Sequence, residues 1–190
     1  TAAFALPIIE KISGDKKVQA IVLCPTRELA LQVSKEFEAL CGTKRVFTLA
    51  VYGGTSINDQ VRQLRRGVQV IVGTPGRTLD LIKRKVLDLS HVKFAVLDEA
   101  DEMLNMGFIE DIETILKRTP ETKRMLLFSA TMPEKIKKLA RKYMGEYKLI
   151  SIEKKQLTTN LTEQIYYEVK QSDKFEALCR LIDIEEDFYG

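Results

Sequence analysis

Apolar residues in this chain of 190 residues gather into short continuous runs rather than alternating with polar positions. Uninterrupted runs of Val, Ile and Leu are typical of strands that are covered on both faces. The pattern predicts strands at residues 18–24, 46–51, 68–72, 94–97 and 125–128, with 149–152 as a candidate for a sixth.

The segments between these runs repeat their apolar residues at helical spacing. Helices are predicted at residues 2–9, at 28–40, from Thr55 or Ser56 to Gly67, from Phe108 to a point before Pro120, and from a first-turn Pro133 onward. Strands that alternate with helices indicate right-handed βαβ units. The expected fold class is therefore α/β, with a parallel β-sheet flanked by helices on both faces.

The chain becomes polar near its carboxyl end, which suggests a division into domains. Residues 1–152 are interpreted as a first domain, 153–163 as a linker, and 164–190 as the start of a second domain. That start is predicted to hold a strand at 164–169 and a helix capped by Ser172. A lone strand and helix bury too little surface to be stable, so they either dock on the first domain or belong to another one.

Composition narrows the class of protein. No apolar run is long enough to span a bilayer, so we expect no membrane partner. The three cysteines are widely spaced and form no metal-ligand pattern, which suggests thiols in a reducing compartment, the cytoplasm. The single histidine, His91, is expected to be a structural or surface-loop residue. A net charge of only +3 does not by itself indicate a nucleic-acid partner.

A polar cluster follows each of the five predicted strands. The clusters lie at residues 25–30, 52–55, 73–77, 98–101 and 129–131. Because the carboxyl ends of parallel strands meet at one edge of a sheet, all five are expected at the same ligand-binding edge. The first three offer arginine, threonine hydroxyls, glycine and helix-start amides, which suit phosphodiester oxygens. Ordinary turn chemistry is the alternative for any one cluster alone, but three along one edge favour a groove that follows a nucleic-acid backbone without base preference.

The last two clusters suit nucleotide hydrolysis. Asp98 at a strand end can hold Mg²⁺, largely through water, and Glu99 can position or deprotonate an attacking water. Asp101 is placed to accept hydrogen bonds from the hydroxyls of Ser129 and Thr131. The alternative is an exposed acidic turn. A glycosidase-like use of Asp98 and Glu99 as paired carboxylates is disfavoured, because adjacent strand residues point to opposite faces.

Taken together, these clusters resemble the motifs of the DEAD-box RNA helicases. Asp98-Glu99-Ala100-Asp101 matches the motif that names the family, and residues 25–30, 53–54, 74–77 and 129–131 match other first-domain motifs in order. The resemblance implies a RecA-like P-loop NTPase domain of an ATP-dependent RNA-unwinding enzyme. It implies ATP and Mg²⁺ as cofactors, RNA as the partner and local unwinding of duplexes. We expect a monomer.

The resemblance also implies a role for individual residues. Asp98 and Glu99 are implied to be catalytic and, together with Thr1, to bind Mg²⁺-ATP, with the metal held by Asp98 and Thr1. Asp101, Ser129 and Thr131 are implied to couple hydrolysis to strand separation. One RNA strand is implied to be held by Arg27, Gly54, Thr74 and Arg77 with the neighbouring Pro25, Thr26 and Gly76.

The chain departs from the family pattern at its first residue. The family's phosphate-binding loop ends in Gly-Lys-Thr, and Thr1 matches its last threonine, so the glycines and the lysine are not among these residues. The adenine-reading segment and the arginine finger are not among them either. We therefore expect a polypeptide of these residues alone to be inactive as an ATPase and helicase. A non-hydrolysing RNA- or protein-binding module stays the leading alternative, and a DNA helicase or other P-loop motor is a third.

Overall fold

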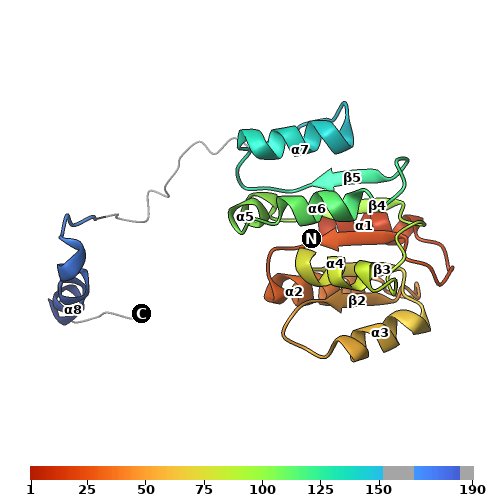
Figure 1. Ribbon diagram of the computed structural model, residues 1–190, viewed down its shortest axis with the longest axis horizontal. Coiled ribbons are helices and arrows are strands. Elements are labelled where there is room, and N and C mark those ends of the chain that lie inside the picture. Colours follow the sequence, from red (N-terminus) through yellow and green to blue (C-terminus); the bar gives the residue numbers. More distant parts are fainter. Residues whose placement is uncertain (152–164, 185–190) are drawn as a thin grey trace. The chain divides into compact units, whose positions relative to one another are not determined.

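The computed structural model describes residues 1–151 and 165–184 and divides the chain into two compact units, Thr1–Lys148 and Leu149–Gly190. The larger unit contains a five-stranded sheet in the order β2-β3-β1-β4-β5 (Figure 1). All neighbouring strands are parallel. The strands are β1 (Ala20–Leu23), β2 (Thr48–Val51), β3 (Val70–Gly73), β4 (Phe94–Leu97) and β5 (Arg124–Leu127). The five predicted strands are confirmed, as is the α/β fold class.

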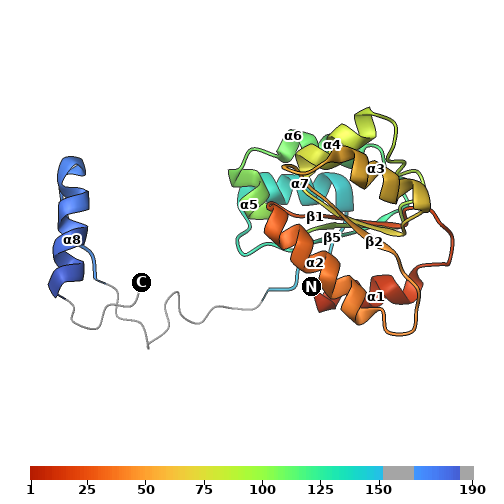
Figure 2. The ribbon, with the colours of Figure 1, turned by 90° about the horizontal axis from the view of Figure 1, so that it is seen from below.

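Helices cover both faces of this sheet (Figure 2). On one face lie α1 (Ala2–Lys11) and α2 (Arg27–Leu40), whose buried residues form one apolar cluster with the sheet. The other face carries α3 (Ile57–Arg66), α4 (Pro75–Lys83), α5 (Ala100–Asn105), α6 (Ile109–Leu116) and α7 (Glu134–Met144). In the smaller unit the structure describes a 3₁₀ turn, η1 (Gln171–Asp173), and α8 (Lys174–Ile184). None of the helices within the described residues is long and apolar enough to cross a membrane.

The burial of β1 explains why its sequence is continuously apolar. Ala20 and Val22 pack into the cluster with α1 and α2, whereas Ile21 and Leu23 pack into the cluster on the opposite face. Successive side chains of a strand point to opposite faces, so a strand covered on both sides needs an apolar residue at every position. All four residues of β1 are buried accordingly.

Three expectations for the secondary structure are wrong. Residues 149–151 form no strand, and Ile152 lies outside the described residues. Residues 165–169 also form no strand, and Gln164 is not described. A strand needs a partner to satisfy its backbone groups, and the described residues offer these segments none. Ser172 does not cap α8: it lies inside η1, and its hydroxyl hydrogen-bonds the Asp173 carboxylate at 2.7 Å.

The helix α4 was not predicted from the sequence. It starts with Pro75 and Gly76, a pair typical of turns, and a polar residue, Thr78, stands in its buried face. Proline is nevertheless favourable at the first position of a helix, where the missing N–H is not needed. The dipeptide here begins a helix rather than a loop.

The core packing gives a test of stability. Phe37 on α2 is fully buried, and its ring lies 6.1 Å from that of Phe4 on α1. We expect Phe37→Ala to lower the free energy of unfolding by about 3–5 kcal/mol, because it removes buried apolar surface and leaves a cavity. Phe47→Ala is the matched control, since Phe47 is 56% exposed and the same truncation should cost below about 1 kcal/mol. Denaturant unfolding measures both, and equal losses would contradict the assignment of the core.

Candidate active site and nucleic-acid interface

The carboxyl ends of the five strands lie in one row. Leu23 at the end of β1 is in register with Gly73 of β3 and with Leu97 of β4. Val51 of β2 pairs with Gly73, and Leu127 of β5 pairs with Leu97. The turns that follow therefore start level with one another, and the residues predicted for the site come from a single edge of the sheet.

The sheet order separates these turns into two groups. The turns that carry arginine, threonine and glycine follow β2, β3 and β1, which are neighbours. The acidic turn follows β4, and the turn with Ser129 and Thr131 follows β5. The border between the groups is the β1–β4 pair, where the Asp98 N–H donates to the Leu23 carbonyl at 2.9 Å. The edge thus has a basic, hydroxyl-rich part and an acidic part.

The acidic turn has an unusual backbone. Glu99 adopts a left-handed conformation, with φ 50° and ψ 53°, and it is the N-cap residue of α5. Non-glycine residues seldom occupy this region, and a strained residue of this kind often marks a functional site. The strand ends at Leu97, so the expected alternation of Asp98 and Glu99 across a strand is wrong. Asp98 is half-buried and Glu99 is exposed, in a turn rather than in a strand.

Hydrogen bonds join the acidic turn to the turn after β5. One carboxylate oxygen of Asp101, Oδ2, accepts from both the hydroxyl and the N–H of Thr131, at 2.8 and 2.9 Å. The Ser129 hydroxyl accepts from the Asp101 N–H at 3.1 Å and donates to the Thr131 carbonyl at 2.7 Å. The predicted contact of Asp101 with Thr131 is confirmed. Ser129 binds the Asp101 backbone instead of its carboxylate.

The environment shifts the pKa values of the three acidic residues in different directions. Partial burial raises the pKa of Asp98, although a backbone hydrogen bond from Glu99 opposes the shift. Burial, and then the charges of Asp98, Asp101 and Glu102, raise the pKa of Glu99. Burial also acts to raise the pKa of Asp101, but the two hydrogen bonds that its carboxylate accepts from Thr131 outweigh that effect and lower it. Asp101 is therefore held as an anion, while Asp98 and Glu99 lack a compensating positive side chain.

The thiol of Cys24 adjoins this part of the site. Cys24 is fully buried at the end of β1, and burial followed by the charges of Asp98 and Glu99 raises the pKa of its thiol. A thiol that does not ionise cannot act as a nucleophile or a metal ligand. Cys24 is thus a buried free thiol that packs beside Asp98.

Thr1 lies near the acidic turn because of the way α1 packs. The Phe4 ring lies 5.2 Å from the ring of Phe128, the residue that directly follows β5. The Thr1 carbonyl accepts from the N–H groups of Phe4 and Ala5, so Thr1 stands at the start of α1. The amino end of a helix favours negative charge, and the start of α1 lies within electrostatic reach of Asp98. The structure therefore brings together Thr1 and Asp98, the two residues expected to hold the metal.

Among the residues that the structure describes, no group of three or more His, Cys, Asp or Glu side chains could hold a metal ion. A site built entirely from protein ligands is therefore not found there. Mg²⁺ has a different requirement, because it keeps several waters and usually takes one or two carboxylates together with phosphate oxygens. Asp98 is half-buried and has no cationic side-chain partner among the described residues, which fits that donor set.

The basic part of the edge is organised around Arg27. Its guanidinium carbon lies 4.9 Å from the centre of the Tyr52 ring, a cation–π contact between the turns after β1 and β2. Gly54 has φ +76°, and a side chain there would point to within 3.9 Å of Arg27 Nη1. Glycine thus permits the backbone turn and leaves the guanidinium accessible. Arg27 itself is exposed.

Arg77 belongs to the same part of the edge. Its two terminal nitrogens donate to Gln60 Oε1 at 3.1 Å and to the Thr55 carbonyl at 3.2 Å. Gln60, a residue of α3, also donates from Nε2 to the Tyr52 carbonyl at 3.1 Å. Sequence reasoning missed Gln60. The sequence does contain a signal for this residue. Gln60 lies three residues after Ile57, so a polar side chain stands in the apolar stripe of that helix.

The remaining predicted RNA-binding residues lie at, or just before, the starts of α2 and α4. Thr26 caps α2 by accepting from the Leu29 N–H at 3.2 Å. Thr74 precedes α4 and, within the described residues, forms no side-chain cap, so its hydroxyl is not committed to the helix. Gly76 is exposed, whereas Pro25 is buried and can contribute only packing and its backbone. The structure brings Thr26, Thr74 and Gly76 to the edge beside Arg27 and Arg77.

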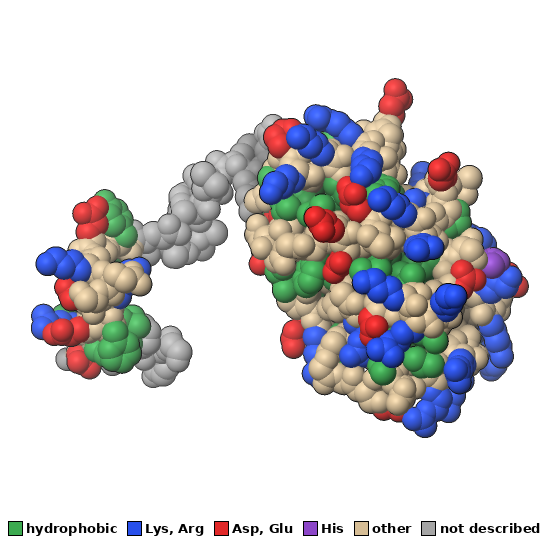
Figure 3. Space-filling model, in the orientation of Figure 1, with side chains coloured by type: hydrophobic (Ala, Val, Ile, Leu, Met, Phe, Trp, Pro, Cys, Tyr) green, Lys and Arg blue, Asp and Glu red, His purple; other side chains and the backbone are tan. Residues whose placement is uncertain are grey.

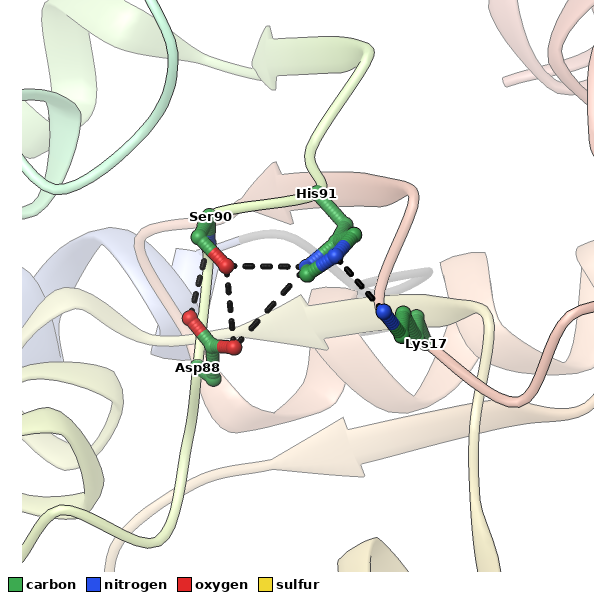
Figure 4. A network of polar contacts seen from close by, with 4 residues as sticks. All are labelled: Lys17, Asp88, Ser90 and His91. Atoms are coloured by element: carbon green, nitrogen blue, oxygen red, sulfur yellow. Dashed lines mark hydrogen bonds and ion pairs between the residues drawn. The ribbon is translucent and has the colours of Figure 1, made fainter.

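A second polar network lies at the opposite edge of the sheet and is not part of this site (Figure 4). Lys17 Nζ contacts His91 Nε2 at 2.8 Å, and His91 Nδ1 contacts the Ser90 hydroxyl at 2.8 Å. An ammonium group can only donate, so His91 accepts at Nε2 and donates from Nδ1. The Ser90 hydroxyl then donates to Asp88 at 2.9 Å. His91 cannot act as a base on Ser90, and it is an exposed loop residue as predicted.

The comparisons with known proteins agree with this geometry. A sequence model of the DEAD/DEAH box helicase family matches residues 1–139. The chain belongs to the DEAD/DEAH box helicase family. It is 52% identical over 186 residues to the ATP-dependent RNA helicase CshA of Listeria monocytogenes, covering 97% of this chain and 36% of that protein. It is 51% identical over 190 residues to a probable ATP-dependent RNA helicase of Methanocaldococcus jannaschii, covering all of this chain and 50% of that protein.

Solved structures lead to the same family. The crystal structure of a DEAD box protein from Methanococcus jannaschii superposes with a TM-score of 0.78 at 49% identity, over 100% of this chain and 50% of that one. A hypothetical ATP-dependent RNA helicase from Sulfolobus tokodaii gives a TM-score of 0.69 at 38% identity, over 77% of this chain and 43% of that one. The fold is thus the RecA-like fold of these helicases. The chain spans between about a third and a half of the length of the curated relatives named above.

The hydrogen bonds of Asp101 give a test by titration. We expect Thr131→Val to raise the pKa of Asp101, because the carboxylate loses a hydroxyl donor and keeps only the N–H of residue 131. Carboxyl ¹³C shifts recorded against pH measure this value. The pKa of Asp88, which hydrogen bonds from Ser90 lower at the opposite edge, should not move.

The same substitution should change how stability depends on pH. A carboxyl group whose pKa is lowered on folding adds stability above its unfolded pKa, about 3.9 for aspartate, and loses it as the pH falls through the folded value. The Thr131→Val variant should therefore be less stable than the wild type near neutral pH, and the difference should shrink in acid. An unchanged pKa of Asp101 would contradict the assigned hydrogen bonds.

Proposed function

We propose that this chain works as the first RecA-like unit of an ATP-dependent RNA helicase that hydrolyses Mg²⁺-ATP to open RNA duplexes locally. One observation carries the proposal: basic, hydroxyl-rich turns after β2, β3 and β1 lie beside an acidic turn that is hydrogen-bonded to the turn after β5. The first group suits a sugar-phosphate backbone, and the second suits a nucleotide. The names of the relatives, which are ATP-dependent RNA helicases, support this proposal.

The acidic part is proposed to hold Mg²⁺-ATP and to catalyse its hydrolysis. Asp98, with Thr1 at the start of α1, would hold the magnesium ion through water and hydroxyl ligands. Bound magnesium would neutralise charge that develops on the phosphates. Glu99 is exposed in the same turn, and its raised pKa makes it a better proton acceptor than an ordinary glutamate. Its role would be to orient and deprotonate the attacking water.

The contacts of Asp101 support a coupling role for the neighbouring turn. Thr131 is held through both its hydroxyl and its N–H, so a movement of the acidic turn would be transmitted to residues 129–131. These residues lead from β5 toward α7. Asp101, Ser129 and Thr131 would in this way link hydrolysis to a change in the hold on RNA.

RNA is proposed to bind across the turns after β2, β3 and β1. Arg27 and Arg77 would contact phosphates, the Thr74 hydroxyl would donate to a phosphate or sugar oxygen, and Gly54 and Gly76 would allow close approach of the backbone. Contacts of this kind carry no information about base sequence. Little sequence preference is therefore expected.

The organisation of the whole protein is part of the proposal. Residues 1–152 would form the first domain, 153–163 a linker, and 164–190 the start of a second RecA-like domain. The segment from Ile165 to Ile184 exposes large apolar side chains, among them Tyr166, Phe175 and Ile184, and exposed apolar side chains of this kind mark a surface that packs against other protein (Figure 3). The protein would act as a cytoplasmic monomer.

Replacing the proposed base gives the direct test of function. In the whole protein, Glu99→Gln should lower RNA-stimulated phosphate release by at least about a hundredfold, because an amide cannot accept the proton of the attacking water. Binding of RNA and ATP should persist. Glu110→Gln is the control: it makes the same change in charge at an exposed residue of α6 that does not act on Glu99, and it should hydrolyse ATP normally. RNA binding without hydrolysis in the wild type would overturn the helicase proposal in favour of a binding module.

A second test concerns the polypeptide of residues 1–190 alone. We expect it to release no phosphate from ATP above background, with or without RNA, because these residues include neither the lysine and glycines of a phosphate-binding loop nor an arginine finger. An arginine finger alone contributes about 10³–10⁵ in rate in related systems. Steady-state phosphate release measures this, and RNA-stimulated turnover by the isolated polypeptide would show the expectation to be wrong.

A further inference from the structure

The most buried residue of α3 is a glutamine. Gln60 is 5% exposed and is the buried residue of this helix, whereas Ile57, Val61 and Leu64 are only partly buried. A surface helix normally buries the apolar stripe that faces the core. Burying an amide is unfavourable unless its polar atoms are hydrogen-bonded. A reason other than core packing is therefore needed for Gln60.

Gln60 joins two turns of the nucleic-acid interface. Its Nε2 atom donates to the Tyr52 carbonyl at 3.1 Å and to the Thr55 hydroxyl at 3.0 Å. Its Oε1 atom accepts from Arg77 Nη1 at 3.1 Å. Tyr52 and Thr55 bracket the glycine turn after β2, and Arg77 comes from α4 after β3. The Gln60 side chain thus hydrogen-bonds both ends of the glycine turn and the Nη1 atom of Arg77.

The chemistry of the partners fixes the orientation of the amide. Arg77 can only donate, so it must face the oxygen of Gln60, and the Tyr52 carbonyl can only accept, so it must face the nitrogen. Both N–H groups and the oxygen are then used. A glutamate here would still bind Arg77 but would place an oxygen against the Tyr52 carbonyl, and a leucine of similar size would remove the hydrogen bonds of all three partners to this side chain.

The other terminal nitrogen of Arg77 also binds the glycine turn. Its Nη2 atom donates to the Thr55 carbonyl at 3.2 Å, so the guanidinium bridges Gln60 and the glycine turn. Gly54 lies inside this bridged turn, next to Arg27. The position of Gly54, of Arg77 and, through Tyr52, of Arg27 therefore depends on a single buried amide.

We infer that Gln60 is a positioning residue for RNA: it holds the glycine turn of residues 52–55 and the guanidinium of Arg77 in the arrangement that receives the phosphate backbone. The inference rests on the proposed function. Gln60 is buried and does not itself contact RNA. It acts through Arg77 and the glycine turn, and it sets their spacing before RNA arrives.

The experiment compares RNA binding with nucleotide use in the whole protein. Fluorescence anisotropy with a short labelled oligouridine and a non-hydrolysable ATP analogue gives Kd, and RNA-stimulated phosphate release gives KM for ATP. Gln60→Leu should weaken RNA binding between about tenfold and a hundredfold, the range expected when buried partners of a charged group lose their hydrogen bonds. KM for ATP should stay unchanged, because the acidic turn follows β4 and does not contact Gln60.

Two further variants protect the test against a general loss of structure. Gln63→Leu is the matched control, because Gln63 is exposed on the same helix and should bind RNA like the wild type. Gln60→Glu keeps the acceptor for Arg77 and loses the donors, so it should bind RNA more weakly than the wild type and better than Gln60→Leu. Thermal unfolding shows whether Gln60→Leu is folded. If it is not, the RNA affinity of Gln60→Glu tests the inference in its place.

A double-mutant cycle tests whether Gln60 acts through Arg77. If it does, adding Gln60→Leu to Arg77→Ala should weaken RNA binding by a smaller factor than Gln60→Leu does in the wild type. Equal factors in the two backgrounds would overturn the inference. So would wild-type affinity in Gln60→Leu and Gln60→Glu, while the proposed function would stand. Failure of the wild type to bind RNA would overturn the proposed function and this inference with it.

Discussion

The in-register pairing of β1 with both β3 and β4 is the constraint on which the site depends. Leu23, Gly73 and Leu97 stand side by side, so the turns after these strands begin at the same level. A shift of one strand by a single residue would move one turn along the edge and would exchange the faces of all its side chains. The continuous apolar sequence of the strands permits this arrangement, because each strand can be buried on both sides. The chemistry of the edge is therefore a consequence of strand register.

Each half of the edge is held by side chains that bind backbone groups of a neighbouring turn. On the basic half, Gln60 and Arg77 hold the carbonyls of Tyr52 and Thr55. On the acidic half, Asp101 holds the N–H of Thr131. Turns have few backbone hydrogen bonds of their own, and such contacts give them a defined shape. The residues that position the turns are thus as necessary to the site as those that face a ligand.

The sequence predicted the five strands, their parallel arrangement and the location of the polar clusters, because these follow from apolar periodicity and from the shared edge of a parallel sheet. It predicted the contact of Asp101 with Thr131 from the placement of both residues after predicted strands. It did not predict the left-handed backbone of Glu99. This conformation depends on how β4 joins α5, and a glutamate at that position does not indicate it. Gln60 was missed for a related reason: its importance comes from partners that are 5, 8 and 17 residues away, and periodicity alone indicated an apolar position.

The two halves of the edge meet only along the backbone of β1 and β4. Within the described residues, no side-chain hydrogen bond joins the group around Arg27 and Arg77 to the group around Asp98 and Asp101, whereas the Asp98 N–H does bind the Leu23 carbonyl. A parallel sheet buried on both faces is stiff, so a small change in the acidic turn would not by itself rearrange the basic turns. Communication between nucleotide and RNA then requires an element that contacts both halves. The turn after β5 contacts the acidic half through Thr131, and the sheet order places it beyond β4, away from the basic turns. Under the proposed function, Thr131 would therefore pass a change in the acidic turn to the chain that leaves the sheet toward α7, rather than across the sheet to the basic turns.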